Sequence, residues 1–162
     1  MKYILIFLTS ICLNTFAMNE WFAYTDNVMG GKSELVAQQN QDVIKLSGTV
    51  STKNNGGFVR LATNPNIASN DIKGIRFLAK GNNEVYDLHV SLKGMKMPPW
   101  SFFSKKFSVR DEWSEYQIEF TEFEKYGYSA RSFNPKNIRE LSFAGYGRDF
   151  TVDLELKDIE LY

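Results

Sequence analysis

The chain has 162 residues, 43% of them hydrophobic, and its 19 basic residues balance 19 acidic ones. With neither a basic excess nor a polybasic run, the sequence lacks the electrostatic signature of a nucleic-acid-binding protein. One cysteine and one histidine exclude a disulfide framework and leave a zinc or copper site without its usual ligands. We therefore expect no cofactor and no metal, although the oxygen-rich segment 64–71 leaves calcium open without requiring it.

Residues 1–17 have the pattern of a secretory signal peptide. A basic residue near the start precedes the apolar run 4–13, and Thr15 and Ala17 are the small or polar residues expected at the −3 and −1 positions of a cleavage site. The run is too short to span a bilayer. We expect cleavage after Ala17, export to the periplasm or the extracellular space, and a mature chain without cysteine or membrane span.

The rest of the chain, residues 18–162, has a hydrophobic period of two. Apolar and polar residues alternate most strictly in 75–79, 86–92, 116–120 and 150–156, which places one face of each strand on a core and the other in water. Together with less regular segments, the expected strands in chain order are 43–50, 57–62, 75–79, 86–92, 102–109, 116–120, 138–143 and 150–156. Clusters of Asn, Gly and Pro separate them, and one helical turn is expected between 122 and 137.

Eight or nine strands at this spacing predict an all-β fold, a two-sheet sandwich or jelly roll. No linker, internal repeat or second domain interrupts residues 18–162, so a single domain is expected.

The segment from Asp26 to Ser33 contains the glycine pair Gly30-Gly31. The following Lys32-Ser33 suggests a phosphate-binding loop, but that motif needs a glycine where Asp26 stands. A structural role is favoured: the glycines permit a positive φ or a close backbone approach, and the side chains of Asp26 and Ser33 can bond neighbouring amides. A surface contact by Asp26 with a ligand remains the alternative.

Arg60 lies between Val59 and Leu61 on a predicted strand, so its side chain faces opposite to theirs. An ion pair with a carboxylate is the simpler interpretation. The alternative is that Arg60 lines a concave sheet face and binds a sugar or an anion.

Asp87, His89 and Ser91 share one strand face, which suggests a catalytic triad. Alternate residues on a strand lie nearly 7 Å apart and point in parallel, so a solvent-facing sheet surface is favoured. Acidic residues in 111–124 could support glycoside hydrolysis, but no apolar neighbour is expected to raise the pKa of one of them. We expect no enzyme activity.

The segment 94–103 is predicted to be a loop because Pro98 and Pro99 prevent regular strand pairing. Its Met95, Met97 and Trp100 can present apolar area to a partner or an aromatic platform to a sugar ring. Alternatively, Trp100 plugs one end of the sandwich.

Three segments together resemble the complex I intermediate-associated protein family: the run 26–33, the run Asn54-Asn55-Gly56-Gly57-Phe58-Val59-Arg60, and 113–123 beginning at Trp113. Trp21 supplies the tryptophan with which the family pattern opens. The turn 81–86 departs from the family, which usually carries an arginine there. The resemblance implies a galactose-binding-domain-like jelly roll and a non-catalytic assembly factor, and it leaves the partner open.

The leading hypothesis is a binding or assembly module that contacts a protein partner through Met97, Trp100 and the surface around Asp26 and Arg60. The alternative is a carbohydrate-binding module that uses Trp100, Tyr86 and Arg60 in a groove. A hydrolase or lyase acting through carboxylates, or through Asp87 and His89, is the third possibility.

Overall fold

The structure is a computed structural model that describes residues 20–95, 101–128 and 131–162. Over these residues the chain forms eleven strands: β1 (Phe22–Thr25), β2 (Glu34–Asn40), β3 (Val43–Val50), β4 (Phe58–Thr63), β5 (Gly74–Gly81), β6 (Val85–Leu92), β7 (Ser101–Ser108), β8 (Ser114–Glu119), β9 (Glu124–Gly127), β10 (Ile138–Tyr146) and β11 (Phe150–Leu161). Four short 3-10 turns accompany them: η1 (Asp26–Met29), η2 (Lys53–Asn55), η3 (Phe120–Glu122) and η4 (Pro135–Asn137). Within these ranges no helix is long and apolar enough to cross a membrane.

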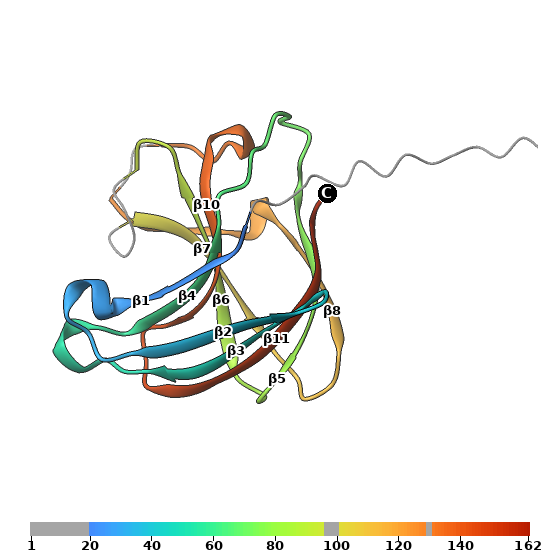
Figure 1. Cartoon of the computed structure of the whole chain (residues 1–162). Coiled ribbons are helices and arrows are strands. Elements are labelled where there is room, and N and C mark those ends of the chain that lie inside the picture. The colour runs from blue at the N-terminus through green and yellow to red at the C-terminus, as the bar shows by residue number, and fades with distance from the viewer. Residues whose placement is uncertain (1–19, 96–100, 129–130) are drawn as a thin grey trace, which may run out of the picture.

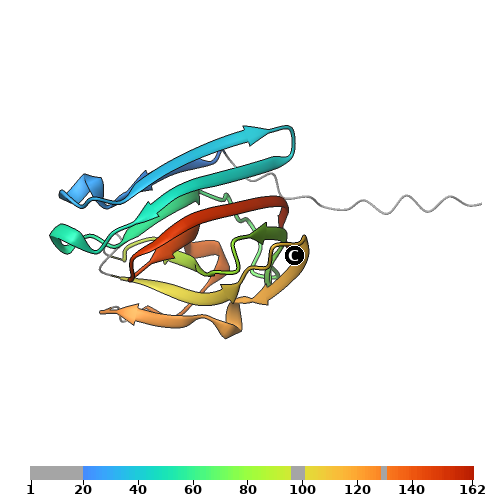
Figure 2. The ribbon, with the colours of Figure 1, turned by 90° about the horizontal axis from the view of Figure 1, so that it is seen from below.

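The strands form two antiparallel sheets that pack as the layers of a sandwich (Figure 1 and Figure 2). The six-stranded sheet has the order β1-β4-β10-β6-β7-β9, and the five-stranded sheet has the order β2-β3-β11-β5-β8. In each sheet a strand from late in the chain, β10 or β11, pairs on both sides with earlier strands. The predicted all-β sandwich is confirmed.

The core lies between the two sheets and follows the predicted alternation. Ile75 and Phe77 of β5 and Leu154 of β11 are almost completely buried. The ring of Phe77 meets Phe107 and Phe143 edge-on, with centroids 5.2 and 4.9 Å apart, an arrangement that aromatic quadrupoles favour.

The two tryptophans of the sequence pattern have different surroundings. Trp21 packs against the core, with its ring centroid 5.8 Å from that of Phe143. Trp113 is partly exposed and lies under the ammonium groups of Lys80 and Lys157, which are 5.1 and 4.6 Å from its ring centroid. Both contacts fit a structural role.

Three strands were missing from the prediction: β1, β2 and β9. Both β1 and β9 have only four residues, too few to establish an alternation, and β2 is an edge strand that is exposed along most of its length. The helical turn expected between 122 and 137 is represented by η4, while β9 occupies part of the same segment.

A single buried carboxylate joins the two glycine-rich loops. Asp26 is fully buried, and it accepts hydrogen bonds from the backbone N–H groups of Ser33 (2.9 Å), Gly57 (2.6 Å) and Phe58 (3.2 Å), and from Ser33 Oγ (2.5 Å). Burial alone would raise the pKa of Asp26, but these hydrogen bonds outweigh it and lower the pKa. These contacts support the predicted structural role of the segment 26–33, in which the Asp26 side chain bonds neighbouring amides.

The glycines of these loops leave room for the carboxylate. A Cβ atom on Gly31 would lie 2.2 Å from Asp26 Cγ, and one on Gly56 would lie 2.4 Å from Asp26 Oδ2. Both distances are far below van der Waals contact, so any side chain would displace Asp26. This steric requirement accounts for glycine in both loops.

We expect Asp26→Asn to lower the free energy of unfolding by about 1–3 kcal/mol, because an amide cannot accept all of these hydrogen bonds and buried N–H groups would lose their partner. Urea unfolding followed by intrinsic fluorescence measures the change. The matched control is Asp42→Asn in the exposed β2–β3 turn, which should change stability by less than about 0.5 kcal/mol. Equal effects of the two substitutions would contradict the role assigned to Asp26.

Candidate functional site

The face of the six-stranded sheet that points away from the core, here called the outer face, carries polar side chains that are buried. Arg60 is 0% exposed, and Asp87, His89 and Ser91 are 4%, 1% and 2% exposed. The prediction of a solvent-facing surface at 87–91 is therefore wrong. One physical reason is aromatic cover: Phe102 stacks on His89 with a centroid separation of 4.0 Å, and Tyr146 meets His89 edge-on at 5.1 Å.

Arg60 points to the outer face, as its position between Val59 and Leu61 predicted. Its guanidinium lies between the rings of Phe58 and Phe102, 5.3 and 5.2 Å from their centroids. Nη1 donates to Ser142 Oγ over 3.4 Å, whereas Nε and Nη2 have no hydrogen-bond partner within the described ranges. Burial lowers the pKa of Arg60, although the nearby Tyr24 and Glu140 act in the opposite direction.

The expected ion pair of Arg60 does not form among the described residues, because no carboxylate lies within salt-bridge distance. The nearby carboxylate that affects its pKa is Glu140, which is itself buried and accepts a hydrogen bond from the Tyr24 hydroxyl over 2.8 Å.

The three residues that suggested a triad do not form one. Asp87 Oδ1 is 3.8 Å from His89 Nε2 and accepts a hydrogen bond from Ser104 Oγ over 3.1 Å. In the part of the chain that the structure describes, both ring nitrogens of His89 and Ser91 Oγ have no hydrogen-bond partner. A catalytic serine is activated by a hydrogen bond to its base. The hydrogen bond between Ser91 and His89 that a triad would need is not formed.

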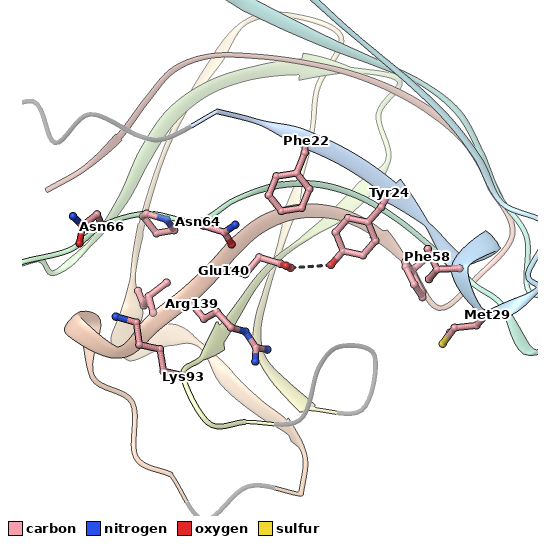
Figure 3. A pocket seen from close by; sticks show the side chains of 12 residues that line it. Phe22, Tyr24, Met29, Phe58, Asn64, Asn66, Lys93, Arg139 and Glu140 are labelled. Carbon is pink, nitrogen blue, oxygen red and sulfur yellow. Dashed lines mark hydrogen bonds between the residues drawn. The ribbon is translucent and has the colours of Figure 1, made fainter.

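The larger hollow of the outer face, here called the aromatic pocket, has a volume of about 830 Å³. It opens between β1, β4 and β10 and the loop that follows β4 (Figure 3). Its lining residues are Phe22, Tyr24, Val28, Met29, Phe58, Asn64, Pro65, Asn66, Lys93, Ile138, Arg139 and Glu140. Phe22 and Tyr24 extend from β1 toward Glu140, and their rings stack at a centroid distance of 6.0 Å.

A second hollow of about 480 Å³, here called the lysine pocket, lies over β7 and β9. Its lining residues are Asp87, Phe102, Ser104, Lys105, Lys106, Glu122, Glu124, Lys125, Tyr126 and Tyr146. The rings of Phe102 and Tyr126 stack at 4.8 Å, and Tyr126 is half exposed. Lys105 pairs with Glu122 over 2.9 Å and lowers its pKa.

The two pockets are neighbours on the same face. A smaller hollow between them shares Met29 and Phe58 with the aromatic pocket and Tyr126 and Tyr146 with the lysine pocket. Arg60 and His89 lie in the sheet between these hollows, on β4 and β6. An extended ligand could therefore contact both pockets at once.

Two of the binding residues proposed from the sequence are corrected by the structure. Asp26 is buried and all its acceptor capacity serves the two loops, so it is not free for a ligand. Tyr86 points into the core, 1% exposed, and its hydroxyl donates to Asn82 Oδ1 over 2.9 Å. Its position on β6 has the parity of the apolar residues, and for that reason it cannot reach the outer face.

The predicted contact loop is only partly described. Met97 and Trp100 lie outside the described residues. Met95 is 6% exposed and its sulfur accepts from the Leu92 N–H over 3.3 Å, so it does not present apolar area to a partner.

The residues that line the aromatic pocket were missed by the sequence analysis. Phe22 and Tyr24 form an aromatic pair with spacing two, a weak signal in a strand of only four residues. Nothing in the sequence near Lys93 or Arg139 indicates that both line the same pocket. Within the described ranges no group of three or more His, Cys, Asp or Glu residues could hold a metal ion.

We expect the stability of the protein to fall as the pH is lowered from about 6.5 toward about 4. Burial lowers the pKa of His89 from 6.5 to about 4, although Asp87 acts against this shift, so the unfolded chain binds a proton over this range before the folded chain does. The loss attributable to His89 reaches about 3 kcal/mol. Urea unfolding at several pH values should show a weaker dependence for His89→Gln, and identical profiles would contradict the assignment.

Several solved structures with a similar fold are carbohydrate-binding modules. The family 11 module of cellulase Lic26A-Cel5E from Clostridium thermocellum superposes with a TM-score of 0.69 at 15% identity, covering 90% of this chain and 88% of that one. The family 11 module from Clostridium thermocellum in complex with a β-1,3-1,4-mixed-linked tetrasaccharide gives a TM-score of 0.62 at 14% identity, covering 89% and 93%. A family 4 module gives 0.59 at 12% identity, covering 88% and 86%. These similarities show the jelly-roll fold alone.

No curated protein sequence matches the chain significantly. The family described as complex I intermediate-associated protein 30 (CIA30) matches residues 13–156, most of the chain. That match includes the two loops joined by Asp26 and the strands of both sheets, in agreement with the resemblance found in the sequence. The chain therefore belongs to the complex I intermediate-associated protein 30 family.

Proposed function

We propose that the chain is a non-catalytic binding module that holds an apolar segment of a partner protein in the aromatic pocket and so assists the assembly or stability of a protein complex. The observation that carries this proposal is the exposed apolar lining of the pocket. Phe22 is 40% exposed, Met29 39% and Val28 73%. Large apolar side chains gathered in a concave surface favour a partner that covers them.

The rigidity of the pocket rim supports this function. Val28 and Met29 project from η1, which begins at Asp26 and ends at Met29; Gly30 caps it with φ at +85°. The hydrogen bonds of Asp26 fix this turn against β4. A rim that is already ordered loses little conformational entropy when a partner binds, so more of the contact energy contributes to affinity.

Membership of the family supports the assembly role in this proposal. The family takes its name from an intermediate of complex I, which agrees with a role in assembly. A family does not fix the partner, and we leave the partner of this chain open. The proposed setting is the periplasm or the extracellular space, supported by the signal-peptide pattern of residues 1–17.

The solvent-accessible carboxyl groups whose pKa is shifted do not have the property that a general acid needs. Among the carboxyl groups with a shifted pKa, Glu84 is lowered by Arg148, Glu122 by Lys105 and Asp149 by hydrogen bonds from Thr52. A general acid needs the opposite shift, which keeps it protonated near neutral pH.

Carbohydrate binding in the lysine pocket is the second candidate. Its specific support is the stacked pair Phe102 and Tyr126, beside the hydrogen-bonding groups of Asp87, Ser104 and Lys106. A half-exposed aromatic ring next to polar groups suits a sugar, whose apolar face stacks while its hydroxyls bond. The fold shared with carbohydrate-binding modules is compatible with this alternative.

We expect the double variant Phe22→Ser, Val28→Ser to bind apolar peptides at least about tenfold more weakly than the wild type, because both side chains lose apolar contact area. The wild-type protein is first screened on an immobilised array of apolar peptides, and the best binders are then titrated by fluorescence anisotropy. Tyr128→Ser is the matched control, since Tyr128 is 99% exposed and does not line the pocket. Unchanged affinity in the double variant, or no peptide binding by the wild type, would overturn the proposal.

The second candidate is tested with a soluble probe, a mixed-linked β-glucan tetrasaccharide, titrated by calorimetry. If carbohydrate binding is the function, the wild type binds this or a related oligosaccharide on a glycan array, and Tyr126→Ala reduces that affinity by about tenfold or more, as expected for the loss of a stacking ring. No binding to the array counts against this candidate and leaves the peptide result unaffected.

A further inference from the structure

The cationic side of the aromatic pocket arises from an irregularity in β10. Between β10 and β6, Ile138 pairs with Leu92 and Glu140 pairs with Ser91. Two steps along β10 therefore match one step along β6, so Arg139 is the extra residue of a β-bulge. A regular strand would turn residues 138 and 140 to one face and residue 139 to the other. With the bulge, Ile138 packs in the core beside Leu92, while Arg139 and Glu140 both line the aromatic pocket.

One hydrogen bond anchors the Arg139 side chain, and two of its nitrogen atoms have no hydrogen-bond partner among the described residues. Its Nη1 donates to the backbone oxygen of Met95 over 3.2 Å, which anchors the guanidinium beside the turn after β6. Its Nε and Nη2 are shielded from solvent and have no hydrogen-bond partner in the ranges 20–95, 101–128 and 131–162. A guanidinium whose donors lack partners is costly, and an oxyanion can satisfy two of them together.

Lys93 adds a second cation on the same side of the pocket, opposite Tyr24 (Figure 3). Neither Lys93 nor Arg139 takes part in a salt bridge among the described residues. Among the described residues of the lining, Glu140 alone is acidic; it is 6% exposed and accepts a hydrogen bond from the Tyr24 hydroxyl over 2.8 Å. The lining thus presents an apolar floor with an unbalanced positive charge at one side.

This combination selects a ligand with an apolar body and one anionic group. The apolar body fits the surface of Phe22, Tyr24 and Phe58, and the anion fits Lys93 and Arg139. The neighbouring β1 favours a polypeptide over other amphiphiles. It is an edge strand that pairs only with β4 among the described residues, and such an edge can bond the backbone of an extended peptide.

We propose that the aromatic pocket recognises a partner segment that combines apolar residues with an acidic side chain, and that Arg139 and Lys93 bind its carboxylate. This inference rests on the proposed function and specifies the chemistry of the partner. Arg139 acts as the specificity residue because its guanidinium is pre-positioned by the bulge and by Met95. Lys93 contributes an ammonium group on a flexible side chain, which attracts the ligand carboxylate over a longer distance.

The test uses two synthetic peptides with acetylated and amidated ends, so that no terminal charge is present. Both carry the same apolar residues, chosen from the best binders of the array, followed by one aspartate in the first peptide and one asparagine in the second. Fluorescence anisotropy at low ionic strength measures both affinities for the wild type, Arg139→Gln, Lys93→Gln and the control Arg110→Gln. Arg110 is exposed and absent from the pocket, and its replacement changes the net charge equally.

We expect the wild type and Arg110→Gln to bind the aspartate peptide about tenfold or more tightly than the asparagine peptide, since charge-assisted hydrogen bonds are worth this much. Arg139→Gln should remove most of the preference while retaining the affinity for the asparagine peptide, and Lys93→Gln should reduce it. Equal binding of both peptides by the wild type would overturn the inference and leave the proposed function intact. Binding of neither peptide would overturn both. Thermal unfolding of each variant verifies that the fold is retained.

Discussion

The carboxylate of Asp26 is the interaction on which the candidate site depends. It joins the turn after β1 to the start of β4 by accepting hydrogen bonds from Ser33, Gly57 and Phe58. Because β1 contributes Phe22 and Tyr24 and β4 contributes Phe58, the same contact sets the spacing of the aromatic side chains in the pocket. The glycines leave room for the Asp26 carboxylate, and the carboxylate fixes the two loops. The aromatic residues on the adjoining strands then form the surface of the pocket.

The central strands of the six-stranded sheet, β4, β10 and β6, are buried on both faces, and the two faces differ in chemistry. The inner face is apolar and packs on the other sheet. The outer face combines Arg60, His89 and Glu140 with aromatic rings, and several of their polar atoms lack partners within the described ranges. Buried polar groups of this kind reduce stability unless something satisfies them.

Much of the fold could be predicted from the sequence, and little of the site could. Alternation in β5, β6, β8 and β11 correctly predicted which residues face the core, because each of these strands has one uniformly apolar face. The same pattern misled at Asp87, His89 and Ser91, since polar residues at alternate positions are typical of a solvent-facing surface. The aromatic pocket draws on β1, β4, β10 and the turn after β6, and the bulge at Arg139 leaves no mark in the sequence. The outward direction of Arg60 was predicted correctly, because it lies between Val59 and Leu61, which face the core. Tyr86 was wrongly assigned to a groove, although it alternates in step with the apolar residues of β6 and therefore faces the core.

The position of β11 sets the order in which the sandwich can be completed. β11 is the last strand in chain order, yet it lies in the middle of the five-stranded sheet, between β3 and β5. The Tyr162 backbone oxygen also accepts hydrogen bonds from the N–H groups of Lys73 and Gly74. The β2–β3 and β5–β8 pairs are therefore separate pieces until residues 150–161 pair with β3 on one side and β5 on the other. Such pairing between distant segments gives a high contact order and slow folding.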